Sequence, residues 1–283
     1  MEKRSVRVRD VKAGDTPNLQ NGIEDLYEDR VDVIVIRGAF PRAPLAEAGA
    51  SLDRDDIAQG WNRPNAKMPV EDIQILGTDT PATPTYSAPR GASLETYLES
   101  AKKHSADTKG VFKPGFDAKA EFQRVLAGCA SGRSADVAST EQGQPYVPYT
   151  IRRLTDGRQI GAHHDYHYGL SLYNELAPRL DTSTLVSFVV TLGKPDAGGE
   201  LFVYGVTPQT PAPKLPNGFS WDVPAIEKEY AFERLVMDVG DVFLLASGRC
   251  LHRVGPIQGP KARVTMGGFL AFDKPRERVL FWS

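Results

Sequence analysis

The chain has few cysteines and no excess of charge of either sign, and both scarcities exclude classes of protein. Only Cys129 and Cys250 occur among 283 residues, too few for a disulfide framework, so a reducing compartment is expected. The 34 basic and 36 acidic residues give a formal net charge of −2. Because nucleic-acid affinity depends on clustered Lys and Arg, the sequence does not predict a nucleic-acid partner.

Long apolar runs are also missing. No stretch approaches the ~20 residues of a membrane-spanning helix, and the opening Met1-Glu2-Lys3-Arg4 lacks the apolar region of a signal peptide. We therefore expect a soluble, cytoplasmic protein without a membrane partner. A hydrophobic fraction of 41% suffices for a full core. The sequence leaves the oligomeric state open and is compatible with a homodimer.

Glycine and proline, at 26 and 21 residues, favour many turns over long helices. The β-branched run 33–36 predicts a strand, and apolar spacing predicts helices over 93–103 and 117–127. The stretch 61–90 is Pro-rich and irregular, and we interpret it as a lid candidate, with a surface-draped insertion as the alternative.

After about residue 145 the chain changes to short β-type runs separated by Gly-rich turns. These runs are 149–154, 159–162, 185–192, 200–204, 235–239, 242–246 and 264–272. Such spacing predicts a sandwich or barrel. We expect one mainly β domain with flanking helices, in which 1–145 supports the core, 146–275 forms it and 276–283 is a C-terminal tail.

Histidine is scarce, and its distribution points to a site. Four of the five histidines fall in two short places, the first with His163, His164 and His167 and the second with His252. The fifth, His104, stands on a polar helix end, where we expect it to be solvated.

His163 and Asp165 are two residues apart, which at a strand end places both side chains on one face. His252, 89 residues later, would complete a face of two histidines and one carboxylate. Non-haem Fe(II) oxygenases use this donor set, because it leaves coordination positions open. An isolated His-x-Asp is common by chance, so the hypothesis depends on the residues downstream.

Arg263 and Thr265 supply that context. They lie two apart in an apolar run, so a guanidinium and a hydroxyl would face the same way into a barrel. An inward arginine needs an anion, because an unpaired buried charge is very costly. A bidentate arginine beside a hydroxyl suits the distal carboxylate of a dicarboxylic acid.

At this point the sequence resembles the Fe(II)/2-oxoglutarate-dependent oxygenases, which have a double-stranded β-helix (jelly-roll) core. The matching segments are His163-His164-Asp165, Gly198-Gly199-Glu200-Leu201, Gly240-Asp241, His252 and Arg263-Val264-Thr265. The chain is more closely similar to a branch that contains N-succinyl amino acid hydroxylases and hapalindole-type alkaloid halogenases. Segments shared with this branch are 35–41, 197–201, 267–272 and 281–283.

The resemblance implies Fe(II) bound by His163, Asp165 and His252, with 2-oxoglutarate and O₂ as cosubstrates. It also implies that Arg263 anchors 2-oxoglutarate and that Thr265 assists. Halogenases of this branch carry Gly or Ala at the carboxylate position, which leaves room for chloride. Because Asp165 stands there, the expected reaction is hydroxylation of a small molecule, with release of succinate and CO₂.

Neighbours of these residues are candidates for substrate contact. Tyr166 and His167 leave the ligand strand into a loop at the barrel mouth, where substrate contact and simple packing are about equally plausible. Arg152 and Arg153 must face opposite sides of their strand, and the sequence does not tell which one enters the pocket to hold a carboxylate.

The residues next to the ligands have other expected roles. His164 should point away from the metal, Arg253 should form an outer ion pair, and Cys250 should fill space in the core. Phe202 and Tyr204 share a strand face and are interpreted as core residues.

Several alternatives remain. An N-acylated amino acid is the favoured substrate, followed by an alkaloid or another secondary metabolite. From a different class comes a jelly-roll metal-binding module without turnover, although such a module needs no inward Arg263. A zinc hydrolase with the same donor set is a further alternative.

Overall fold

The computed structural model describes residues 4–52, 54, 57, 60–63, 72–77, 93–165, 175–218 and 220–283. Its helices are α1 (Thr16–Leu19), α2 (Gly22–Tyr27), α3 (Arg42–Ser51), α5 (Leu94–Asp107), α6 (Ala118–Gly128), the short η1 (Ala177–Arg179) and α8 (Val223–Glu229). Within these ranges, every helix is too short or too polar to cross a lipid bilayer.

A large nine-stranded sheet forms one side of the barrel. Its main path runs in the order β1 (Val8–Lys12), β2 (Val33–Arg37), β11 (Val242–Leu245), β7 (Val186–Gly193), β14 (Arg263–Phe272), β15 (Val279–Trp282) and β4 (Ala135–Val137). Beside β14 the sheet forks, because β5 (Thr150–Leu154) pairs with the first half of β14 and β15 pairs with the second half. Strand β3 (Gln74–Leu76) then pairs with β5.

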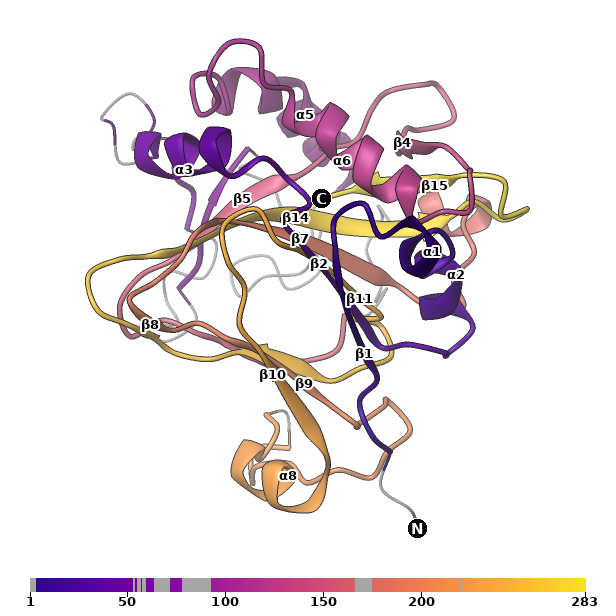
Figure 1. The fold of residues 1–283 in the computed structure, drawn as a ribbon, viewed down its shortest axis with the longest axis vertical. Coiled ribbons are helices and arrows are strands. Elements are labelled where there is room, and N and C mark those ends of the chain that lie inside the picture. The colour runs from indigo at the N-terminus through magenta and orange to yellow at the C-terminus, as the bar shows by residue number, and fades with distance from the viewer. Residues whose placement is uncertain are drawn as a thin grey trace.

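A four-stranded sheet faces the large one. Its order is β10 (Phe232–Leu235), β9 (Leu201–Tyr204), β12 (His252–Val254) and β6 (Ile160–His163). The short strands β8 (Ala197–Gly198) and β13 (Ile257–Gln258) form a third sheet. Figure 1 shows the two main sheets lying opposite each other, with α3, α5 and α6 outside the large sheet and α8 outside the small one. The expected mainly β architecture with flanking helices is confirmed.

Alternation along β7 explains why the large sheet can serve both a core and a cavity. Phe188 points toward the helices, where its ring contacts Phe122 at 4.7 Å between centroids. Ser187 and Val189 point the other way and line the space between the sheets. The apolar core therefore lies between the large sheet and the helices, and the cavity lies on the opposite face.

Both predicted helices are confirmed, and each has a side-chain cap. Ser93 Oγ accepts a hydrogen bond from the Thr96 amide at 3.1 Å, and Asp117 Oδ1 accepts one from Ala120 at 3.0 Å. The expectation for His104 is wrong. Helix α5 continues to residue 107, so His104 lies on its buried face and is 8% exposed, and its Nε2–H donates to the Tyr149 carbonyl at 2.9 Å.

One predicted strand lies at other residues than expected, and the segment expected as a tail contains a strand. The strand expected at 235–239 lies at 232–235 instead, because the next residues form a turn in which Asp241 accepts the amide of Asp238. The expected C-terminal tail contains β15, whose four residues are all buried and pair with β14 and β4.

Candidate metal and anion site

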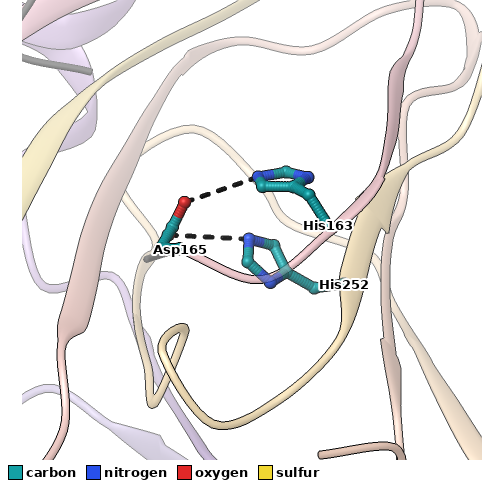
Figure 2. Close-up of side chains that lie close together, drawn as sticks. All are labelled: His163, Asp165 and His252. Atoms are coloured by element: carbon teal, nitrogen blue, oxygen red, sulfur yellow. Dashed lines mark ion pairs between the residues drawn. The ribbon is translucent and has the colours of Figure 1, made fainter. Parts of the chain in front are cut away.

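Two histidines and one aspartate meet at the inner face of the small sheet. His163 ends β6 and His252 begins β12, and the two are direct partners in the antiparallel ladder. Asp165 follows β6, and its amide donates to the Ser247 carbonyl at 2.9 Å. Figure 2 shows the carboxylate of Asp165 turned toward both imidazoles.

The distances are those of a metal-binding group. Asp165 Oδ1 lies 3.5 Å from His163 Nε2, and Oδ2 lies 3.7 Å from His252 Nε2. One ligand atom from each residue lies within 4.8 Å of the others. Because metal–nitrogen and metal–oxygen bonds are about 2.0–2.2 Å long, one divalent ion can contact all three.

The protein fixes the tautomer of both imidazoles. His163 Nδ1 lies 2.8 Å from the Gly161 carbonyl, and His252 Nδ1 lies 3.0 Å from the Cys250 carbonyl. Since a carbonyl oxygen only accepts, the proton must sit on Nδ1, and the Nε2 lone pair is left for a cation. This is the neutral form in which histidine binds metals.

The electrostatic environment also suits a cation. Burial raises the pKa of Asp165, but its electrostatic interactions with His163, His252 and Ser247 outweigh burial and hold that pKa well below its usual range. Burial, with the charge of His163, lowers the pKa of His252 to about 4. At neutral pH the group therefore holds an ionised carboxylate beside a neutral His252.

Across the cavity, β14 and β5 place polar groups on the same inner face. Thr265 on β14 is the direct partner of Arg152 on β5, and Arg263 is the partner of Leu154. All four line the cavity together with the metal-binding group. The space between the walls, its open mouth included, is about 600 Å³.

Arg263 is 8% exposed and its environment calls for an anion. Burial and the like charge of Arg152 lower the pKa of Arg263 to about 10. In the part of the chain that the structure describes, no carboxylate forms an ion pair with Arg263. A buried guanidinium of this kind is stabilised when an anion enters the cavity.

The backbone conformation at Gly198 and Gly199, two residues of the segment shared with the oxygenases, explains why both are glycine. Gly198 and Gly199 both have positive φ, at +74° and +71°. A Cβ on Gly198 would lie 1.9 Å from the Pro256 carbonyl oxygen, and one on Gly199 would lie 3.1 Å from Arg263 Cδ. The second glycine thus leaves room for the stem of Arg263 to pass into the cavity.

The structure shows which of Arg152 and Arg153 faces the cavity, a choice that the sequence left open. Arg152 lines the cavity, whereas Arg153 lies on the opposite face with its guanidinium 5.8 Å from the Trp61 ring centroid. Tyr166 and His167 lie outside the described residues, so their predicted substrate contact stays a prediction. Most of the lid candidate 61–90 also lies outside them, although Ile73 lines the cavity.

The roles expected for His164, Cys250 and Arg253 are confirmed. His164 is buried and its Nε2 lies 3.2 Å from the Val206 carbonyl. Cys250 is fully buried. Arg253 pairs with Glu227 at 2.9 Å on the outer side of the small sheet.

Phe202 and Tyr204 flank the same outer face rather than the cavity. Tyr204 is fully buried there and Phe202 is half-buried, and both belong to the apolar cluster around α8. The other residues that line the cavity were not predicted from the sequence, and they include Ser187, Val189, Phe243 and Phe269. Alternation along 185–192 was the signal that would have indicated the first two.

Known proteins resemble this chain in sequence and in fold. A family model described as carrier-protein-independent halogenase WelO5 matches residues 7–283. Among solved structures, the chain is similar to an N-substituted L-amino acid dioxygenase from Burkholderia ambifaria AMMD, with 15% identity, a TM-score of 0.54 and coverage of 94% of this chain and 91% of that one. No curated protein sequence matches.

Two further solved structures have lower TM-scores. The same Burkholderia ambifaria dioxygenase in complex with alpha-KG gives a TM-score of 0.48 at 15% identity, with 93% and 91% coverage. A 2OG-Fe(II) oxygenase family oxidoreductase from Burkholderia pseudomallei gives 0.45 at 14% identity, with 94% and 95% coverage.

Proposed function

Since the chain belongs to the carrier-protein-independent halogenase family of the Fe(II)/2-oxoglutarate oxygenases, we propose that it hydroxylates an unactivated C–H bond of a small molecule. The observation that carries this proposal is the carboxylate of Asp165, whose two oxygens face His163 Nε2 and His252 Nε2. A halogenase of this type needs that position for chloride. With a carboxylate bound there, the outcome is hydroxylation, with succinate and CO₂ as the coproducts.

In this proposal His163, Asp165 and His252 hold Fe(II). Two neutral imidazoles and one carboxylate are the donor set that suits non-haem iron and leaves further positions open. The carboxylate also offsets part of the cation's charge, which a third imidazole would not do. When bound, the iron supplies the activation of O₂ that the side chains themselves cannot perform.

Arg263 and Thr265 hold the distal carboxylate of 2-oxoglutarate. The guanidinium offers a planar pair of donors, and the hydroxyl of Thr265 adds another from the same face of β14. Binding this anion would relieve the electrostatic cost of burying Arg263 beside Arg152. The rest of the cavity, with Phe243 and Phe269 among its walls, would exclude water from the reacting groups.

Arg152 supports a substrate that carries its own carboxylate. It is a second guanidinium in the cavity, so one dicarboxylate cosubstrate and one acidic substrate would both find a cationic partner. An N-acyl amino acid, such as an N-succinyl amino acid, has this chemistry. The dioxygenase with the similar fold is described as acting on N-substituted L-amino acids. An uncharged alkaloid would leave Arg152 without such a role.

Anaerobic titration of the apoprotein with Fe(II) and 2-oxoglutarate tests the proposal. A weak metal-to-ligand charge-transfer band in the visible is expected, which Arg263→Ala and His252→Ala should remove. Arg153→Ala is the matched control, because Arg153 faces away from the cavity, and should retain the band. Tight Fe(II) binding without any band would contradict the proposal and favour a metal-binding module or a zinc hydrolase.

A separate measurement distinguishes hydroxylation from halogenation. With a panel of N-succinyl L-amino acids in the presence of chloride, mass spectrometry should find a gain of one oxygen atom in the product and succinate in equal amount. A chlorinated product from the unmodified protein would contradict the assignment of hydroxylation.

A further inference from the structure

The outer face of the small sheet carries a polar network directly behind the metal-binding group. Arg253 follows His252 on β12, so the two side chains point to opposite faces of the strand. Arg253 Nε donates to Tyr204 Oη at 2.6 Å, and its Nη2 donates to Glu227 Oε1 at 2.9 Å. Tyr204 Oη in turn donates to Glu227 Oε1 at 2.8 Å, which closes a triangle of hydrogen bonds.

This network is partly buried, since the side chain of Arg253 is 16% exposed and that of Glu227 is 30% exposed. The guanidinium of Arg253 lies 3.8 Å from the centroid of the Phe202 ring, and Tyr204 is fully buried. Charge-assisted bonds in partly buried surroundings are stronger than those on an open surface.

Glu227 belongs to an element outside both sheets. Helix α8 and its flanking loops, residues 206–230 apart from 219, are here called the α8 segment. Asp222 caps the helix by accepting the Ala225 amide at 3.1 Å. Ile226 of the helix is fully buried in a cluster with Tyr204 and Leu251. The α8 segment is thus fixed to the outer face of β9 and β12 by apolar contacts as well as by Glu227.

Both metal-ligand strands make contact with this segment. Leu251, just before His252, donates its amide to the Val206 carbonyl at 2.9 Å. His164, between the two other ligands, has its Nε2 3.2 Å from the same carbonyl, and its ring lies 5.8 Å from that of Trp221. The neighbours of all three proposed ligands therefore rest on one outer element.

We propose that the α8 segment positions the metal-binding group, with Arg253, Tyr204 and Glu227 as positioning residues that hold β12 in the register at which His252 faces Asp165. This inference rests on the proposed function, since it assumes that the group binds a metal. The three residues touch neither the cavity nor the cation. They act through the backbone of β12, which carries Arg253 outward and His252 inward.

Tyr204→Phe is the sharpest test, because it removes one hydroxyl and keeps the ring. That hydroxyl takes part in two of the three bonds of the triangle. Tyr230→Phe is the matched control on the same segment, since the Tyr230 hydroxyl donates only to the exposed Pro211 carbonyl at 3.3 Å. Glu227→Gln pairs in the same way with Glu229→Gln, because Glu229 is exposed on the same helix.

The readout is the affinity and absorption spectrum of Co(II) bound to the apoprotein without oxygen, with thermal unfolding measured in parallel. Replacing a residue bonded directly to a metal ligand costs about 10–100-fold in affinity, so this more distant network should cost about 10-fold. Tyr204→Phe and Glu227→Gln should weaken Co(II) binding and alter its spectrum, whereas both controls should match the unmodified protein. Arg253→Lys keeps the charge but loses the planar fork that bonds Tyr204 and Glu227 together, so it should lie with the two weakened variants.

The outcomes separate this inference from the proposed function. Unchanged Co(II) affinity and spectrum in Tyr204→Phe and Glu227→Gln would overturn the positioning role and leave the metal site intact. A lower unfolding temperature with unchanged Co(II) affinity would also overturn it, because the network would then be merely structural. Failure of the unmodified protein to bind Co(II) would overturn the proposed function together with this inference.

Discussion

The two walls of the cavity differ in how their polar groups are satisfied. On the metal wall, formed by β6, β12 and Asp165, the protein supplies a partner for each ligand, since carbonyls hold both imidazole Nδ1–H groups and Ser247 accepts the Asp165 amide. On the anion wall, formed by β5 and β14, Arg263 has no carboxylate partner within the described ranges. The first wall is organised before any ligand binds, and the second becomes complementary only with an anion.

This difference follows from the sheets that carry the walls. The metal wall belongs to a short four-stranded sheet, which the α8 segment covers from outside. The anion wall belongs to the long β14, which is buried along its whole length. A residue facing inward from so buried a strand can be charged only if it has a specific use. Substitutions on the two walls should therefore affect different quantities, the affinity for the cation and the affinity for carboxylates.

The largest effect is expected for Asp165→Gly on the metal wall. Loss of the carboxylate removes one of three protein ligands and opens a position, so hydroxylation should fall by more than about 10²-fold, beyond the usual effect of changing a neighbour of a ligand. Chloride should then change the visible spectrum of the Fe(II) protein. Product analysis by mass spectrometry with and without chloride measures both effects.

Retention of full hydroxylation by Asp165→Gly would remove Asp165 from the ligand set. The metal wall would then consist of two histidines only, and the distinction between hydroxylase and halogenase would have to come from another residue.

The next largest effect is expected for Arg263→Ala on the anion wall. Loss of a charge-assisted, bidentate contact should cost about 3 kcal/mol, or roughly 10²-fold in affinity for 2-oxoglutarate. The affinity for Co(II) should stay within about 2-fold, because Arg263 touches no metal ligand. Isothermal titration of the two ligands separately measures both quantities.

Arg263→Lys supplies the matched comparison, since it keeps the charge and loses the planar fork, and should recover only part of the 2-oxoglutarate affinity. If Arg263→Ala weakened Co(II) binding as much as it weakened 2-oxoglutarate binding, the two walls would not be independent.

The site was more predictable from the sequence than the fold around it. The two-residue spacing of His163 and Asp165 brings their side chains together, although Asp165 lies just beyond the end of β6, and the structure brings His252 to them as expected. Arg263 and Thr265 face the same cavity for the same reason. The sequence could not choose between Arg152 and Arg153, because alternation says only that they face opposite ways. Register with β14 decides it, since Arg152 pairs with the inward Thr265.

The fold errors share a physical cause, which is tertiary contact that local pattern does not contain. The tail at 276–283 contains an apolar run of only four residues, and pairing with β14 and β4 makes these residues, 279–282, a buried strand. Polar surroundings in the sequence suggested that His104 is solvated, but packing of α5 on the ring of Tyr149, 4.9 Å away, buries it. Strand β4 and Tyr149 are both distant in the chain from these segments, so neither contact could be predicted from spacing.

A smaller effect is expected for Arg152→Ala, which tests what the second arginine of the anion wall binds. If Arg152 binds the substrate carboxylate, the KM for N-succinyl L-amino acids should rise by about 10–100-fold, as for one charge-assisted hydrogen bond of about 1.5–3 kcal/mol. The affinity for 2-oxoglutarate should change far less. Arg153→Ala, which changes the neighbouring residue on the opposite face, should leave both quantities unchanged.

Carboxamide analogues of the substrates test the same contact by changing the ligand and not the protein, because they lack the carboxylate that Arg152 would bind. They should bind poorly to the unmodified protein, and Arg152→Ala should bind acid and amide about equally well. A large loss of 2-oxoglutarate affinity in Arg152→Ala would assign this arginine to the cosubstrate, and the argument for an acidic substrate would fail.

The smallest effect is expected away from both walls, at His104. Burial lowers the pKa of His104 to about 4, despite its hydrogen bond to Tyr149. The unfolded chain therefore binds a proton as pH falls below about 6.5, while the folded protein does not until about pH 4. The stability present above pH 6.5 should be lost as pH falls, with His104 accounting for about 2 kcal/mol between pH 7 and 5.

His104→Gln keeps a donor for the Tyr149 carbonyl and removes the titration, so its unfolding free energy should depend less steeply on pH. The slope should be reduced and not abolished, because burial also lowers the pKa of His164 to about 4. Urea unfolding of the apoprotein at pH 7, 6 and 5 measures this, and Co(II) and 2-oxoglutarate affinities at pH 7 should be unchanged. An identical slope in the variant would show that His104 titrates alike in both states, and a changed Co(II) affinity would link this helix to the metal wall.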